Sequence, residues 1–123
     1  MTHTKATTDD VDSVVPAEWG GMWFLKEPLG TEHCGVTILE LEPGGKGRAH
    51  DHAGDGQEEV YVCVDGTVDV DLGGDPAADD FDAAETVTLR RNEALRVSAD
   101  EARRLANRGD VRCRCVIAGA PIG

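Results

Sequence analysis

Two histidines and a carboxylate in the middle of the chain have the types and the spacing of metal ligands. His50 and His52 are separated by one residue, and Glu59 follows seven positions later. Alternate residues of an extended chain point to the same face, so both imidazoles project together if residues 48–52 are extended. If this segment pairs with the next strand, Glu59 comes up beside them. Two imidazoles and one carboxylate on one face can hold a divalent metal ion and leave coordination positions open.

The same residues also have an interpretation that needs no metal. The chain contains four histidines and 24 acidic residues, so a His-x-His pair near a carboxylate can arise by chance. A solvated loop would accept such a group without any function. On spacing alone, both interpretations stay open.

Residues 44–66 resemble the first motif of the cupin superfamily, G-x5-H-x-H-x3,4-E-x6-G. Both glycines, both histidines and Glu59 match, but six residues separate His52 from Glu59 where the family has three or four. The extra residues are rich in Gly and Asp, which is typical of a lengthened turn. Gln57 or Glu58 could instead take the ligand position. The six residues between Glu59 and the closing glycine favour Glu59.

Residues 92–107 resemble the second cupin motif, G-x5-P-x-G-x2-H-x3-N, at fewer positions. Asn107 matches the final asparagine, whereas Ser98 and Asp100 replace the proline and the second glycine. Arg103 replaces the histidine that the resemblance makes the fourth metal ligand. A guanidinium cannot ligate a metal, but it can form a bidentate bond to a carboxylate or phosphate. Arg103 therefore either fixes an anionic ligand above a three-ligand metal, or reaches solvent or an acidic residue in a decayed site.

The resemblance extends over about residues 35–121 and implies an all-β fold, an antiparallel double-stranded β-helix or jelly-roll barrel. The sequence pattern favours the same class, with about eight to ten short strands bounded by turns and no strong helix. The main candidate strands are 20–26, 35–42, 60–64, 67–72, 86–89, 94–97, 102–107 and 111–118. Asp65-Gly66, after the third of them, is a strong hairpin signal.

One boundary, between residues 15 and 16, follows from composition. Residues 1–15 are polar and acidic with weak periodicity, which predicts a flexible N-terminal arm. Residues 16–123 are predicted to form a single cupin barrel domain, because a chain of 123 residues fits one core.

Strand alternation and the resemblance together nominate further site residues. Tyr61 shares a face with Glu59, and Asn107 shares one with Arg103. The candidate catalytic residues, as acid, base or orienting group, are Tyr61, Gln57 and Arg103. The candidate ligand-binding residues are Arg103, Tyr61 and Asn107.

The four cysteines do not form a recognisable metal-binding or disulfide framework. Cys113 and Cys115 alternate along a strand, and Cys63 shares the face of Glu59, while Cys34 lies earlier in the chain. Small buried apolar side chains are the favoured interpretation. A thiol near the interior site is the alternative.

The net charge of −12, with three lysines against nine arginines, argues against nucleic acid as a partner. Such a composition is typical of a halophilic protein kept soluble in concentrated salt. The N-terminal residues lack the apolar core of a secretory signal, and no run of the chain is long enough to span a membrane. We therefore expect a cytoplasmic protein without membrane contact.

The resemblance implies a small-molecule ligand and a divalent metal, Fe, Mn or Zn. It allows an enzyme, such as a dioxygenase or a sugar-phosphate isomerase, but it does not choose among them. It equally allows a non-catalytic binding or sensing module, or a structural remnant without metal. Because barrels of this kind often pair through an edge strand, we also predict a homodimer.

Overall fold

The computed structural model describes residues 2–122 and consists almost entirely of antiparallel β-sheet. Within these residues the strands are β1 (Gly20–Phe24), β2 (Gly35–Leu41), β3 (Glu58–Asp65), β4 (Thr67–Leu72), β5 (Glu85–Arg90), β6 (Ala94–Val97), β7 (Arg103–Ala106) and β8 (Cys113–Ala120). The helical segments are the short η1 (Thr8–Asp10) and α1 (Lys26–Leu29). In the described part of the chain, no helix has the length and apolar character needed to cross a membrane.

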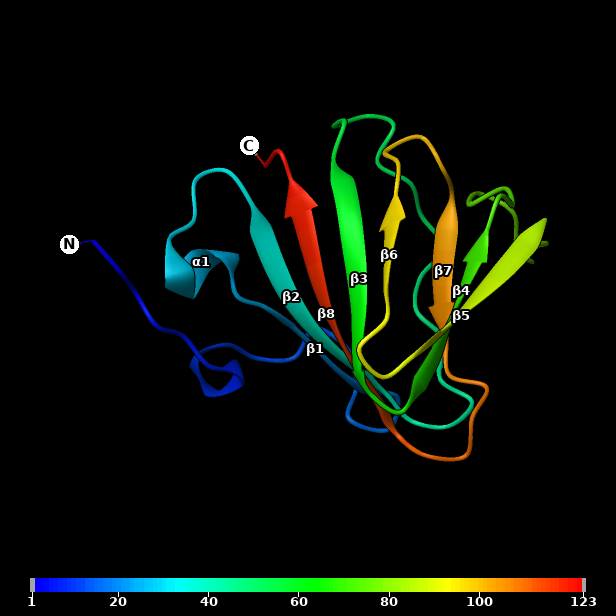
Figure 1. The fold of residues 1–123 in the computed structure, drawn as a ribbon, viewed down its shortest axis with the longest axis horizontal. Helices are drawn as coiled ribbons and strands as arrows, with labels where there is room; N and C mark the ends of the chain where they lie inside the picture. The colour runs from blue at the N-terminus through cyan, green and yellow to red at the C-terminus, as the bar shows by residue number, and fades with distance from the viewer. Residues whose placement is uncertain (1, 123) are drawn as a thin grey trace.

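The strands form two sheets that enclose the core (Figure 1). One sheet has the order β1-β2-β8-β3-β6 and the other the order β5-β4-β7, and every paired strand is antiparallel. Valine and leucine side chains from both sheets, together with three cysteines, pack into one hydrophobic cluster. Two antiparallel sheets around one core confirm the predicted all-β, double-stranded β-helix fold.

Strand β4 shows how alternating residues build the smaller sheet. Val68 and Val70 point inward and are fully buried, as their alternation predicts. Asp71 faces the other side, yet it is only 1% exposed, because two arginines cover it. Arg104 Nη2 lies 3.2 Å and Arg108 Nη2 lies 2.8 Å from Asp71 Oδ2. This outer face is therefore closed by ion pairs rather than by apolar packing.

The prediction of a hairpin at Asp65-Gly66 is wrong. β3 pairs with β6 and β8 in the larger sheet, whereas β4 pairs with β5 and β7 in the smaller one. Gly66 has a φ of 72°, and a Cβ there would lie 3.0 Å from the Cα of Cys113, so glycine is required. The turn reverses the chain tightly, as its sequence indicates, but it carries the chain from one sheet to the other.

The segment 46–52 pairs with β7 instead of β3. Its bridges join Lys46 to Ala106 and His50 to Arg103. Between these two bridges the segment advances by four residues, whereas β7 advances by three. This mismatch makes the run irregular, as a bulge does. The predicted pairing with the strand that carries Glu59 is therefore wrong, and the carboxylate meets the imidazoles across the space between the two sheets.

The N-terminal residues lie along the free edge of β1. The backbone N–H of Met22 donates to Ser13 Oγ at 3.0 Å, and that of Val14 donates to the Met22 carbonyl oxygen at 2.9 Å. The division into a flexible arm, 1–15, and a barrel domain, 16–123, stays a prediction. Residues 1 and 123 lie outside the described range.

Candidate metal centre and cavity

Two separate elements bring the predicted metal ligands together. His50 and His52 come from the segment along β7, and Glu59 comes from β3. His52 Nε2 lies 3.3 Å and His50 Nε2 lies 3.6 Å from Glu59 Oε1. The three candidate ligand atoms all lie within 4.8 Å of one another. Ligand atoms at about 2.1 Å from one metal ion lie about 3 to 3.5 Å apart, so these separations suit a shared ion.

Each imidazole is oriented by a hydrogen bond at its other nitrogen. His50 Nδ1 lies 3.0 Å from the Arg48 carbonyl oxygen, and His52 Nδ1 lies 3.1 Å from Asp55 Oδ2. A carbonyl and an ionised carboxylate only accept hydrogen bonds, so Nδ1 carries the proton in both rings. Nε2 is then the nitrogen that presents a lone pair to a metal ion, in the manner of metal-binding histidines.

The buried nitrogen of His52 tests whether the site suits a metal ion. His52 Nε2 is buried and has no hydrogen-bond partner among residues 2–122. A lone pair on this nitrogen facing Glu59 Oε1 is unfavourable unless a cation or a proton lies between them. The residues therefore fit a divalent cation.

The Glu59 carboxylate also accepts hydrogen bonds from two side chains other than the histidines. Tyr61 Oη donates to its Oε1 at 2.5 Å, and Arg103 Nη1 donates to the same oxygen at 3.1 Å. Burial alone would raise the pKa of Glu59, but His50 and Tyr61 outweigh it and the pKa is lowered. Burial and the Glu59 charge raise the pKa of Tyr61, so the phenol keeps its proton and remains a donor. The Glu59 hydrogen-bond interaction raises the pKa of His50.

Arg103 is the most deeply buried charge of this cluster. Its side chain is 0% exposed, and Nη2 donates to the Ser98 carbonyl oxygen at 2.6 Å while Nη1 contacts Glu59. Its Nε is buried without a partner in the described residues. The guanidinium thus stands behind the carboxylate, away from solvent, and neutralises the charge of Glu59.

The other nominated residues lie in different surroundings. Gln57 lines the cavity, where its Nε2 donates to the Pro121 carbonyl oxygen at 3.2 Å. Glu58 points outward to Arg96, so Glu59 rather than Glu58 joins the imidazoles. The Asn107 amide lies elsewhere and donates to the carbonyl oxygens of Leu41 and Val111, at 2.8 Å each.

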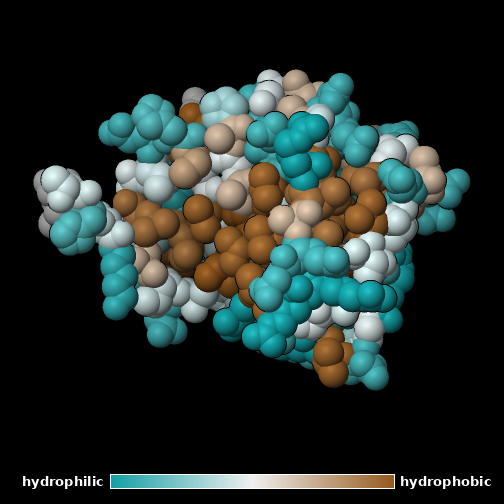
Figure 2. Space-filling model, in the orientation of Figure 1, coloured by the Kyte–Doolittle hydropathy of each residue, from teal (hydrophilic) through white to brown (hydrophobic). Residues whose placement is uncertain are grey.

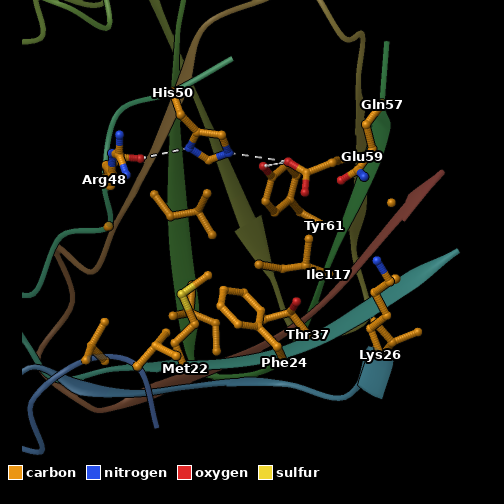
Figure 3. Close-up of a pocket in the computed structure, with 18 of the residues that line it drawn as sticks. Met22, Phe24, Lys26, Thr37, Arg48, His50, Gln57, Glu59, Tyr61 and Ile117 are labelled. Carbon is orange, nitrogen blue, oxygen red and sulfur yellow. Dashed lines mark hydrogen bonds and ion pairs between the residues drawn. The ribbon is translucent and has the colours of Figure 1, made fainter. Parts of the chain in front are cut away.

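An open cavity of about 1430 Å³ lies in front of the three candidate ligands. Figure 3 shows His50, Glu59 and Tyr61 on one side of it, with Met22 and Phe24 on the other. Figure 2, in the orientation of Figure 1, shows a band of hydrophobic side chains across the face of the molecule, bordered by hydrophilic ones. The candidate metal centre therefore opens onto a largely apolar space.

Three of the cysteines are core residues. Cys63, Cys113 and Cys115 are buried in the hydrophobic cluster, Cys34 is exposed, and all four are free thiols. Cys63 Sγ lies 3.4 Å from the Gly66 carbonyl oxygen, below the turn between the sheets. Their position agrees with the favoured interpretation of small buried apolar side chains.

Residues 37–119 match the family model for the cupin domain. The chain belongs to the cupin family. This match covers the strands from β2 to β8, including the histidine segment and Glu59. Membership in the cupin family confirms the resemblance found in the two motifs.

Solved cupin structures share the fold at low sequence identity. A cupin protein from Bacteroides fragilis has a TM-score of 0.71 and 18% identity, with 100% of this chain and 87% of that chain covered. A conserved protein with a double-stranded β-helix domain from Klebsiella pneumoniae has a TM-score of 0.71 and 14% identity, covering 95% and 89%. A cupin-superfamily sugar phosphate isomerase from Silicibacter pomeroyi has a TM-score of 0.66 and 18% identity, covering 96% and 76%. No curated protein matches the chain.

Two details of the site were not predicted from the sequence. Asp55 lies in the lengthened turn and holds His52 in place, and the acidic residue that Arg103 reaches, one of the alternatives left open above, is Glu59 itself. The first could have been found from the cluster of acidic residues just after the histidine pair. The Arg103–Glu59 pair depends on how β7 and β3, which belong to different sheets, lie across the core from each other. Neither sequence motif contains this information.

Proposed function

We propose that this cupin binds one divalent metal ion, Fe, Mn or Zn, through His50, His52 and Glu59, and holds a small anionic organic ligand beside it. The observation that carries the proposal is the convergence of two Nε2 atoms on Glu59 Oε1, with one of them buried and unpartnered. A bound ion would supply Lewis-acid polarisation of a ligand oxygen. The apolar cavity wall would exclude water from the ligand and strengthen polar contacts at the centre.

The protein side of any reaction would depend on Tyr61 and Gln57. Tyr61 keeps its proton and is already bonded to Glu59, so it fixes that carboxylate rather than acting as a base. Gln57 lines the cavity, and its side chain packs on Gly119, where an added Cβ would meet the amide at 2.4 Å. An isomerase or a dioxygenase is compatible with these roles, and turnover against keto acids, phenols and sugar phosphates tests the class.

A non-catalytic binding or sensing module is the second candidate, and Arg103 favours it. The guanidinium already compensates the charge of Glu59, so the carboxylate can stay ionised and buried without a metal. In this version the cavity holds its ligand next to an Arg–Glu–Tyr cluster, with the imidazoles as hydrogen-bonding groups.

Metal analysis after desalting separates these candidates. Protein loaded with iron, zinc or manganese should retain about one ion per chain, and His50→Ala or His52→Ala should lose most of it, because two ligands chelate weakly. His33→Ala is the matched control, since its side chain is 94% exposed and lies next to Glu32 rather than at the centre. If the wild type retains no more metal than His50→Ala, the metal-binding proposal fails and the metal-free candidate stands.

A further inference from the structure

A strip of basic side chains runs along one wall of the cavity. Lys46, Arg48, His50 and His52 occupy alternate positions of the segment along β7, and all four line the cavity. Two permanent cations, both solvent-exposed, therefore lie on the same wall as the two imidazoles.

These cations stand out against the charge of the whole chain. The protein has 12 lysines and arginines against 24 acidic residues. Half of these cations form ion pairs with carboxylates within residues 2–122: Arg96, Arg103, Arg104, Arg108, Arg112 and Arg114. Of the remaining half, three line the cavity: Lys26, Lys46 and Arg48. Half of the cations without a carboxylate partner in the described residues thus lie where a ligand would bind.

Two of the three acidic residues that line the cavity are engaged with other groups, and the third, Glu27, is exposed next to Lys26. Glu59 accepts from Arg103 and Tyr61, and Asp55 accepts from His52. Arg103 itself has both terminal nitrogens engaged and is fully buried, so an anion in the cavity would meet Arg48 and Lys46 first.

The wall opposite the basic strip is apolar. It is formed by β1, β2 and β8, where Met22, Phe24 and Ile117 face the cavity (Figure 3) and Leu39 also lines it. A sugar would leave most of its hydroxyl groups without partners against this wall, whereas a hydrocarbon or aromatic body would be removed from water. The cavity therefore has a basic strip on one side and a mainly hydrophobic wall on the other, with Lys26 at the end of that wall (Figure 3).

We propose that the cavity takes an amphiphilic anion, a molecule with an apolar alkyl or aryl body and one carboxylate or phosphate group. Arg48 and Lys46 hold the anionic group, and the β1–β2–β8 wall holds the body. Alternate residues of an extended chain are about 7 Å apart, so the anionic group lies beside the imidazoles rather than on them. The inference rests on the proposed ligand-binding role of the cavity, but not on the presence of a metal.

Calorimetric titration of the full chain, stripped of metal, compares four probes. Octanoate and octyl phosphate carry both features, octan-1-ol lacks the charge, and glucose 6-phosphate lacks the apolar body. At least one octyl anion should bind about tenfold more tightly than octan-1-ol, because a charge-assisted hydrogen bond is lost in the alcohol. Glucose 6-phosphate should bind more weakly than either octyl anion. The better octyl anion identifies the head group.

A double variant assigns the anion-binding residues. Lys46→Gln with Arg48→Gln should lose about tenfold in affinity for the octyl anion and little for octan-1-ol. Arg90→Gln with Arg91→Gln is the matched control, because both arginines are exposed, form no ion pair in the described residues and lie outside the cavity. It changes the net charge equally and should bind like the wild type. Phe24→Ser should weaken binding of all three octyl probes.

Three results would overturn the inference: equal affinity for octanoate, octyl phosphate and octan-1-ol; tightest binding of glucose 6-phosphate; or the same loss in both double variants. Metal retention, measured on portions of the same preparations that are loaded with metal and then desalted, keeps the two proposals apart. A wild type that binds octyl anions but no metal contradicts the metal centre alone. A wild type that holds metal but does not distinguish the octyl anions from the alcohol contradicts the amphiphile alone.

Discussion

Arg103 and a metal ion would share one carboxylate oxygen. Glu59 Oε1 accepts a hydrogen bond from Arg103 at 3.1 Å and faces both imidazoles. The guanidinium therefore offsets part of the negative charge that would attract a metal ion to this oxygen. A site with two neutral imidazoles and a neutralised carboxylate is a weaker cation site than one with a fourth neutral ligand. The identity of residue 103 thus sets how strongly the centre holds its ion.

We predict that Arg103→His tightens metal binding by about tenfold or more, since it removes a positive charge and adds a ligand. Competition with a chromophoric chelator measures the dissociation constant. Arg103→Met separates the two effects, because it removes the charge without adding a ligand. An affinity that is unchanged in both variants would mean that Arg103 does not influence the ion.

Proton competition gives a second prediction at the residue scale. Metal binding needs neutral imidazoles, so affinity should fall as the pH drops through the pKa of histidine, about 6.5 in a free imidazole. The interaction with Glu59 raises the pKa of His50, so protonation begins at a higher pH than in a free imidazole. Metal retention measured between about pH 5 and pH 8 checks this, and a flat profile would contradict the assignment of histidine ligands.

At the scale of single elements, the outer face of β4 depends on Asp71. The Arg108 hydrogen bonds lower the pKa of Asp71 well below its ordinary value, although burial opposes them. A carboxyl whose folded-state pKa is depressed stabilises the fold above its unfolded-state pKa, near 4, and loses this contribution as the pH falls below it.

We predict that Asp71→Asn lowers the free energy of unfolding by about 2–3 kcal/mol at pH 7, because it leaves two arginines without their shared carboxylate. The difference from the wild type should shrink as the pH falls below about 4, because the unfolded chain then takes up a proton at Asp71 that the folded protein, with its lowered pKa, does not. Denaturant unfolding at several pH values measures it. Asp79→Asn, on an exposed loop residue, should change little at any pH.

The elements also show which features of the molecule could be read from the sequence. Strict alternation in β4 and the spacing from Glu59 to Gly66 are local patterns, and both predicted the structure correctly. The partner strands of β3 and of segment 46–52 could not be predicted in this way. Asp65-Gly66 has the residues of a tight turn whether the next strand stays in the same sheet or leaves it. The Arg103–Glu59 pair joins residues 44 positions apart, so it depends on the same non-local pairing.

At the scale of the whole molecule, the net charge of −12 bears on stability. Like charges repel across the surface, and salt screens them, with a Debye length of about 3 Å at 1 M. We predict that the melting temperature rises between about 0.1 M and 2 M KCl. Sucrose at matched viscosity is a useful control without ions. A melting temperature that is flat across this range would remove the basis for the halophilic and salt-dependent interpretation.

The predicted homodimer is a second property of the whole molecule. β1 is an edge strand of the larger sheet whose middle residue, Met22, already bonds to residues 13 and 14. Trp19 just before β1 and Phe24 at its end are 50% and 48% exposed, and packing of two such edges against each other would cover both aromatic side chains. Sedimentation at working salt should therefore give twice the mass of the chain, and Phe24→Lys should shift it toward the monomer. A monomeric wild type would contradict the prediction.

Segments before β1 and after β8 contribute to the cavity, which matters for recombinant work. Val14, Val15 and Pro16 line it before β1, and Pro121 and Ile122 line it after β8. An affinity tag fused directly after residue 123 would begin within two residues of Ile122. A polyhistidine tag there would offer surplus imidazoles to any metal and a flexible peptide to the apolar surface. Metal counts and ligand affinities are therefore best measured on protein from which the tag has been cleaved.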